Sequence, residues 1–479
     1  MPFTAVFLWT DILIYLLLVV GFLAVFYIRK YPHLRKPWAY VFKRKRGVIS
    51  VSILLVYIVI GSLDSIHFRL ALPVDKVTGS QHYSTEVLTL LDLSILPLRD
   101  QVEKTYSSPF ATTLFVREMQ VSSTGKTDYI YPKLRYAGSH LNSEQEKKSD
   151  IIATLFQYIT YAVMTWLLLM AMIFMAWSLT KKIKIRQLLK QLYEGESDYP
   201  LKTLFSLILV ILITFFTCLG LSIDYHILGT DKVGQDVFYQ ALKSVRTGLV
   251  IGSVTTLVML PFALFLGITA GYFKGWIDDV IQYIYTTLNS IPGVLLIAAA
   301  VLMMQVYMDN HPDSFSTIAE RADVRLLFLC IILGLTSWTG LCRILRGETL
   351  KLREADYVLA ARSLGVGNLT ILHRHILPNL MHIVMISVVL DFSGLVLAEA
   401  VLSYIGVGVD PSMISWGNMI NSARLEMARE PIVWWSLAAA FVSMFVLVLA
   451  ANLFADVVRD AFDPKTDKAA DESLTHANA

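Results

Sequence analysis

Nine apolar stretches, each long enough to cross a bilayer, recur along the chain between polar connections. A hydrocarbon core of about 30 Å needs about 20 apolar residues in a helix that rises about 1.5 Å per residue. We therefore predict an all-α polytopic membrane protein with about nine transmembrane helices. The predicted spans are 11–28, 48–66, 151–178, 203–223, 245–271, 280–306, 325–343, 380–406 and 432–455.

The composition agrees with this pattern. Of 479 residues, 55% are hydrophobic and 16% are charged, whereas a water-soluble domain carries about 25% charged residues. The formal net charge of +3 is too small and too dispersed to indicate nucleic-acid binding. All three cysteines fall in apolar runs, which argues against a disulfide framework and a thiolate metal site. We predict no cofactor and no bound metal.

Basic residues concentrate in three of the connections, and acidic residues in another. Lys and Arg dominate residues 29–46, 181–190 and 343–374, whereas Asp and Glu dominate 309–323. Short loops rich in Lys and Arg stay on the cytoplasmic side of a membrane. This distribution predicts a multi-pass membrane protein with the N-terminus outside and the C-terminus inside.

The spans fall into two groups. Residues 1–200 hold three spans and a polar insertion at 67–150, which we expect to form a small extracytoplasmic domain of mixed structure. Residues 203–464 hold the other six spans, and 465–479 form a polar cytoplasmic tail. We expect the first group to add stability or an outer docking surface. Its strand-like runs are Thr112–Val116 and Asp128–Leu134.

Two motifs resemble a nucleotide-binding site and a metal site, but the spacing of their residues does not match either kind of site. Gly125-Lys126-Thr127 resembles the end of a phosphate-binding P-loop, but Gln120 stands where that loop needs a glycine. His373, His375 and His382 are two and seven residues apart, so they lack the i, i+4 pair that would place two metal ligands on one helical face. No group of catalytic side chains stands out, and we predict that the chain is not an enzyme.

Two carboxylates, Asp391 and Glu399, lie within the eighth predicted span. A charged side chain at the centre of a bilayer costs roughly 2.5–3.5 kcal/mol, so each needs a polar environment. Eight residues of helix place them on broadly the same side. They could line a translocation pathway or form interhelical hydrogen bonds. We favour hydrogen bonds for Asp391 and leave both roles open for Glu399.

The connection at 344–379, here called the coupling loop, is longer than two helices need, which suits docking to a soluble partner. Its strings Tyr357-Val358-Leu359-Ala360-Ala361-Arg362-Ser363-Leu364-Gly365 and Arg374-His375-Ile376-Leu377-Pro378-Asn379 resemble the EAA loop of binding-protein-dependent ABC importer permeases. Leu359 replaces the usual glutamate and His375 the usual isoleucine. The resemblance implies an ATPase-coupling set of Glu354, Tyr357, Ala360, Ala361, Gly365, His375, Leu377 and Pro378.

Further matches follow in family order over residues 203–464. The variant of the coupling loop is similar to that of the dipeptide/oligopeptide subfamily. A second motif at 229–236, here called the glycine motif, resembles the family's outer-face signature. Its matching residues are Gly229, Thr230, Asp231, Gly234 and Asp236.

The resemblance implies a permease subunit of an ATP-driven importer in the bacterial inner membrane, with peptides as the favoured substrates. It implies a second homologous permease, two cytoplasmic ATP-binding subunits and an extracytoplasmic solute-binding protein as partners, and transport by alternating access. Three alternatives remain: a proton-coupled secondary transporter with Asp391 or Glu399 as its relay, a scaffold that transports nothing, and an importer of nickel, glycosides or another small solute.

Overall fold

The computed structural model describes residues 3–73, 82–121, 127–141, 143–181, 200–312, 315 and 317–462. Within these ranges, nine helices are long and apolar enough to cross a membrane, which confirms the all-α polytopic fold class. The nine are α1 (Trp9–Lys30), α3 (Lys45–Asp64), α6 (Lys147–Lys181), α8 (Leu201–Asp224), α9 (Val237–Phe273), α11 (Gly293–Asn310), α12 (Ile318–Arg353), α15 (Leu377–Ile405) with its preceding turns, and α17 (Trp435–Phe462). The predicted tail and Gly125-Lys126 lie outside the described residues.

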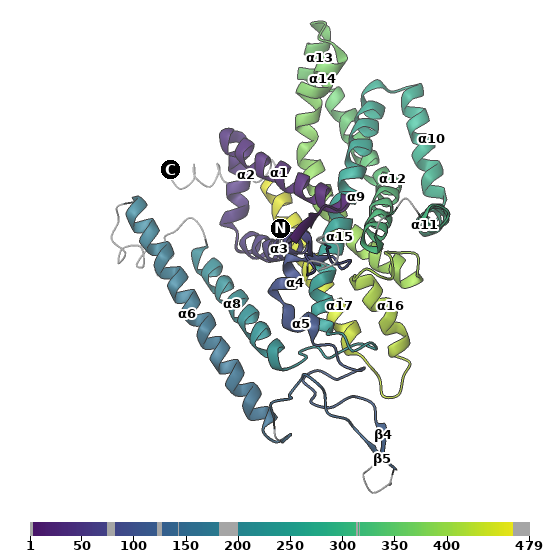
Figure 1. The fold of residues 1–479 in the computed structure, drawn as a ribbon. Coiled ribbons are helices and arrows are strands. Elements are labelled where there is room, and N and C mark those ends of the chain that lie inside the picture. Colours follow the sequence, from purple (N-terminus) through teal and green to yellow (C-terminus); the bar gives the residue numbers. More distant parts are fainter. Residues whose placement is uncertain are drawn as a thin grey trace.

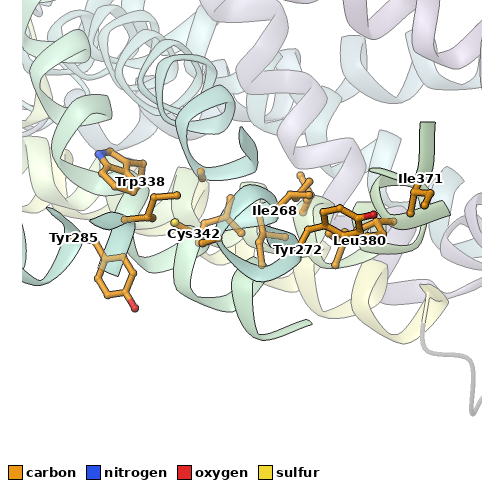
Figure 2. Close-up of a cluster of buried hydrophobic side chains, with 14 of the residues drawn as sticks. Ile268, Tyr272, Tyr285, Trp338, Cys342, Ile371 and Leu380 are labelled. Carbon is orange, nitrogen blue, oxygen red and sulfur yellow. The ribbon is translucent and has the colours of Figure 1, made fainter. Parts of the chain in front are cut away.

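Helices α9 and α12 pack along each other in the centre of the bundle (Figure 1). At about 1.5 Å per residue, each is longer than a bilayer is thick. A cluster of buried side chains joins them to their neighbours and extends in a row from Trp338 to Ile371 (Figure 2). In a membrane such contacts stabilise through close packing rather than through removal of apolar surface from water. The row therefore makes one packed unit of α9, α12 and the start of α15.

The sixth predicted span, 280–306, is not one helix. It consists of α10 (Trp276–Ser290) and α11, separated at Ile291 and Pro292. Proline has no N–H to donate and disfavours the helical conformation of the residue before it. Ile291 is accordingly extended, with φ −87° and ψ 129°. Of the two pieces, only α11 is long and apolar enough to cross a membrane.

The coupling loop projects from one end of the bundle (Figure 1). Helix α12 continues into it as far as Arg353, and the chain leaves the helical conformation at Glu354 and Ala355. Three short elements then lead into α15: α13 (Asp356–Ser363), α14 (Asn368–Ile371) and one π-helical turn (Leu372–Ile376).

The segment before α6 combines short helices and strands. Strands β1 (Phe3–Val6), β2 (His67–Leu70) and β3 (Leu88–Thr89) form an antiparallel sheet in that order. The predicted run Thr112–Val116 contributes only a bridge between Thr113 and Lys133. The hairpin strands are β4 (Glu118–Val121) and β5 (Thr127–Ile130), and the short helices are α2 (Pro32–Lys43), α4 (Leu90–Ser94) and α5 (Leu96–Asp100).

Helices α6 and α8 form a pair at the side of the bundle (Figure 1). The Trp166 indole N–H donates to the carbonyl of Phe205 at 3.0 Å, and the Tyr225 hydroxyl donates to Asp150 at 2.7 Å. Helix α8 begins the second sequence group, yet its main packing partner, α6, ends the first. The boundary read from the sequence therefore does not coincide with a boundary in space.

Candidate functional site

The coupling loop is anchored by buried apolar side chains. Val358 of α13 and Ile371 of α14 are 1% and 0% exposed. Both belong to the cluster that also contains Ile376, Leu380 and residues of α9 and α12 (Figure 2). Since packed interiors deform little, a displacement of α13 is transmitted to α9 and α12.

Polar contacts fasten the base of the coupling loop to the end of α9. The Tyr272 hydroxyl donates to Asn368 Oδ1 at 2.9 Å, and Arg353 donates to the Tyr272 carbonyl at 2.9 Å. Glu354 is exposed and pairs with Lys274 at 2.9 Å. The hydrogen bond from Lys274 lowers the pKa of the Glu354 carboxyl below its ordinary value. Glu354 thus joins the junction between α12 and α13 to the residue that follows α9.

The remaining predicted residues lie on both sides of the turn into α15. The Asn379 side chain donates to the Tyr357 hydroxyl at 3.1 Å and to the His375 carbonyl at 2.7 Å. The Tyr357 and His375 rings lie 6.3 Å apart. Leu377 packs against the buried cluster, whereas Pro378 is exposed in the first turn of α15.

The tip of the coupling loop presents apolar side chains to solvent. Leu364 and Leu369 are 83% and 81% exposed, and Gly365 between them has φ +76°. Ala360 is exposed and Ala361 is buried, so α13 has one face on the protein and one face free. Exposed leucines next to a rigid turn are typical of a surface that another protein covers.

The glycine motif lies at the opposite end of the bundle, against a segment of the N-terminal group. A Cβ on Gly234 would lie 1.8 Å from the carbonyl oxygen of Glu103, and one on Gly229 would lie 2.4 Å from that of Ser107. Both glycines also have positive φ, +78° and +70°. Only glycine fits such positions without strain, so the motif is shaped to hold residues 103–107.

The polar members of the glycine motif complete this junction. Thr230 is fully buried and donates to the Thr105 carbonyl at 2.8 Å. Asp231 accepts hydrogen bonds from the backbone of Val233 and Gln235, both at 2.9 Å. Asp236 caps α9 by accepting from the Tyr239 N–H at 3.0 Å. These contacts of Thr230, Asp231 and Asp236 are all with other parts of this chain, which indicates a structural role.

A buried histidine connects the same two segments. His226 lies between Asp236, whose Oδ2 is 2.7 Å from Nδ1, and Glu103, whose Oε1 is 3.7 Å from Nε2. Burial lowers the pKa of His226, but the two carboxylates outweigh it and raise that pKa to about 9. Backbone N–H groups and His226 lower the pKa of Glu103 against the effect of burial. The imidazolium between two carboxylates is therefore the stable form at neutral pH.

A second charged group was not singled out by sequence reasoning. Buried Arg246 of α9 donates to Asp11 of α1 at 2.6 Å and to Thr10 at 2.9 Å, and lies 3.5 Å from Asp323 of α12. One turn away, Lys243 pairs with Asp64 at 2.7 Å. Arg246 falls inside the predicted span 245–271, so an unpaired arginine in an apolar run was the available signal.

The two intramembrane carboxylates of α15 differ in environment. Glu399 is 1% exposed and accepts hydrogen bonds from the Ser403 hydroxyl at 2.7 Å and the Ser415 hydroxyl at 3.2 Å. Asp391 is half-buried, and no hydrogen bond joins it to another described residue. Glu399 is therefore hydrogen-bonded within α15 and to Ser415 at the start of α16 (Trp416–Glu426), whereas Asp391 has no such partner in the described part of the chain.

Within the described ranges, no group of three or more His, Cys, Asp or Glu side chains is arranged to hold a metal ion. The two ends of the bundle differ. One end carries the exposed apolar tip of the coupling loop on a packed base, and the other end is held by buried ion pairs.

Comparison with known proteins identifies the class. The family model "binding-protein-dependent transport system inner membrane component" matches residues 263–468. The glutathione transport system permease protein of Pectobacterium atrosepticum is 35% identical over 242 residues, which cover 50% of this chain and 73% of that protein. The oligopeptide transport system permease protein of Mycobacterium bovis is 31% identical, covering 50% of this chain and 76% of that protein.

A third permease is similar as well. The dipeptide transport system permease protein of Lactococcus lactis is 29% identical, covering 51% of this chain and 65% of that protein. An inward-facing structure of the methionine ABC transporter MetNI aligns with 47% of this chain and 96% of its own, at 15% identity and a TM-score of 0.35. A permease of this kind works with separate ATPase subunits and a partner permease. The chain belongs to the binding-protein-dependent transport system inner membrane component family, as a multi-pass permease of an ABC importer.

Proposed function

We propose that the substrates of this importer are peptides. The similar permeases are named as parts of transport systems for glutathione, oligopeptides and dipeptides, which supports the proposal. Glutathione is itself a small peptide, so the three share a backbone amide and charged termini. The coupling loop, with its exposed tip on a buried base, is the observation that carries the transport mechanism.

We infer the composition of the complex from the same resemblance. This chain pairs with a second, homologous permease, two cytoplasmic ATP-binding subunits dock on the coupling loops, and an extracytoplasmic protein delivers the solute. The coupling loop faces the cytoplasm because Arg353, Arg362 and Arg374 lie there. The glycine motif then lies on the outer side, and the N-terminus is outside.

The coupling loop acts as a rigid connection between ATPase and bundle. ATP binding closes the ATPases, and their movement reaches Leu364 and Leu369 at the tip. The buried contacts of Val358 and Ile371 pass that movement to α9 and α12. The two permeases then rock about a central cavity, which opens alternately to each side. Glu354, Tyr357, Ala360, Ala361, Gly365, His375, Leu377 and Pro378 are the residues assigned to this coupling.

The N-terminal group stabilises the permease and shapes its outer face. The support is that α1, α3 and residues 86–110 supply the buried acidic partners of Lys243, Arg246 and His226. Deletion of residues 1–199 would leave Lys243 without its acidic partners. Arg246 and His226 would each keep one carboxylate, Asp323 and Asp236 respectively.

Uptake into proteoliposomes tests the function. The complete complex with its solute-binding protein should accumulate labelled tri-alanine only when ATP is supplied at the ATPase side. Accumulation driven by a proton gradient alone would favour the secondary-transport alternative. Uptake of nickel or a glycoside without uptake of peptides would refute the substrate class while leaving the importer class intact.

A further inference from the structure

A polar cavity of about 240 Å³ lies between the glycine motif and α16 (Trp416–Glu426). Its walls come from the glycine motif, the start of α9, the 411–415 connection, α16 and the first residues of α17. The side chains that matter are Asp231, Gln240, Asn418, Ser422, Glu426 and Ser436. None of these was assigned a binding role by the sequence except Asp231, as part of the motif.

Glu426 gives this cavity an unsatisfied charge. Its side chain is buried, with the residue 3% exposed. One carboxylate oxygen, Oε1, accepts a hydrogen bond from the Tyr106 hydroxyl at 3.2 Å. The other, Oε2, is buried without a hydrogen-bond partner in the described part of the chain. A buried carboxylate oxygen left unpaired costs several kcal/mol, so a donor is expected to reach it.

Two amide side chains of the cavity, Gln240 and Asn418, have hydrogen-bond acceptors for their N–H groups. Gln240 Nε2 donates to Asp231 Oδ2 at 2.7 Å, and Asn418 Nδ2 donates to the carbonyls of Asp410 and Met413, both at 2.9 Å. These partners accept only, which fixes the orientation of both amides. Each amide oxygen therefore remains as an acceptor. The cavity therefore offers acceptors and a carboxylate, beside the hydroxyls of Ser422 and Ser436 and the ammonium of Lys232.

We propose that this cavity binds a primary ammonium group, namely the α-amino terminus of a peptide on its way into the importer. An ammonium carries three N–H donors and one positive charge, which match a carboxylate oxygen and two amide oxygens. A divalent metal fits less well because Glu426 and Asp231 are the only carboxylates among the lining residues. The inference rests on the proposed peptide substrate and adds a recognition site to it.

Lys232 is the cation among the lining residues that could fill the site instead, whereas Arg429 lies over the Tyr106 ring. Lys232 lines the cavity, its side chain is exposed, and it forms no ion pair with Glu426 in the described structure. A bound Lys232 would make Glu426 a structural residue. The Lys232→Gln variant separates these cases, because it should leave peptide uptake within twofold if the substrate supplies the ammonium.

The test is uptake of labelled tri-alanine by the complete reconstituted transporter, measured beside the ATP hydrolysis that the loaded solute-binding protein stimulates. Glu426→Gln removes the charge and keeps the shape, so uptake should fall about tenfold or more while stimulated ATP hydrolysis stays within twofold. Tyr106→Phe is the matched control: it removes the hydrogen bond to Oε1, keeps the free Oε2, and should keep uptake near the native value.

A second variant tests the site from the other direction. Ser422 lies four residues before Glu426, on the same face of α16. Ser422→Lys should supply a tethered ammonium to Glu426 and block uptake, whereas Ser422→Met, of similar length and no charge, should reduce it far less. Equal effects of Lys and Met would overturn the proposal.

Three other outcomes would also overturn it. They are native uptake in Glu426→Gln, a parallel loss of uptake and of stimulated ATP hydrolysis, which would indicate docking of the solute-binding protein, and loss of uptake in Lys232→Gln equal to that in Glu426→Gln. A native complex that imports no peptide at all would instead refute the proposed substrate class.

Discussion

The two ends of the bundle are held together by different forces. At the end with the glycine motif, buried charges join elements far apart in sequence, as Arg246 joins α1, α9 and α12. At the end with the coupling loop, an apolar cluster does most of this work. There the ion pair of Lys274 with Glu354 is exposed, and that of Arg346 with Asp278 is partly buried.

This difference bears on which end can move. A buried charge that leaves its partner loses several kcal/mol, so ion-paired elements have one favourable arrangement. Apolar surfaces can shift against each other at smaller cost, provided that they stay packed. We therefore expect the contacts at the end with the glycine motif to persist unchanged while the permeases rock, and any small adjustment of packing to occur at the end with the coupling loop.

The strongest test breaks the fixed end. Arg246→Met removes the cation between Asp11 and Asp323 and should destabilise the protein by about 3–5 kcal/mol, because two buried carboxylates lose the guanidinium that they share. Asp11 keeps its contact with His67 at 2.7 Å. We expect little assembled complex, measured by yield and thermal unfolding of the purified transporter. Arg321→Ala breaks an exposed ion pair with Asp309 and should cost less than about 1 kcal/mol. Similar stabilities of the two variants would contradict the comparison.

At the other end, Gly365→Val should impair transport more than stability. Valine at φ +76° is strained by about 1–2 kcal/mol, although a Cβ there meets no other atom. The turn between α13 and α14 should shift, so that uptake falls at least tenfold while the complex still assembles and hydrolyses ATP. Gly365→Asn, which tolerates positive φ, should stay close to native uptake. Native uptake in Gly365→Val would remove the coupling role of this turn.

Alkaline pH should weaken only the fixed end. The pKa of His226 is raised to about 9 from an ordinary value of 6.5, so its contribution is complete below pH 6.5 and is lost as pH rises through 9. The slope is at most about 1.4 kcal/mol per pH unit. Glu103, whose pKa is lowered, contributes above pH 4.5 and loses its effect as pH falls. Thermal unfolding should therefore show an alkaline decline that His226→Gln flattens; an unchanged decline would exclude His226 as its source.

The smallest effect is expected at Glu399. Glu399→Gln preserves the shape and one carbonyl acceptor for the Ser403 and Ser415 hydroxyls, so uptake should stay within about threefold of native. The variant should be compared at matched membrane levels. A strong loss of uptake in an intact complex would show that the charge itself is needed, and Glu399 would then be part of the pathway.

The spans could be predicted because each depends only on a local run of apolar residues. Pro292 was the sequence signal for the break between α10 and α11. Because apolar residues continue on both sides of it, hydropathy alone predicted a single span there. The partners of Arg246 and Glu426 could not be predicted, since a single sequence does not record which distant residues meet. The coupling loop was found through its motif, whereas the exposure of Leu364 and Leu369 depends on the packing of α13 and α14.

The ion pair of Asp11 with Arg246 also constrains the order in which contacts can form while the protein is synthesised. Asp11 is synthesised 235 residues before its arginine, and Thr10 is synthesised 313 residues before Asp323. The first helix must therefore enter the bilayer while its carboxylate has no partner, and its place in the first turn keeps that carboxylate near water. The contact of Arg246 with both Asp11 and Asp323 can form only after α12 has left the ribosome. A chain interrupted earlier would remain an open intermediate, exposed to the proteases that clear unassembled membrane proteins.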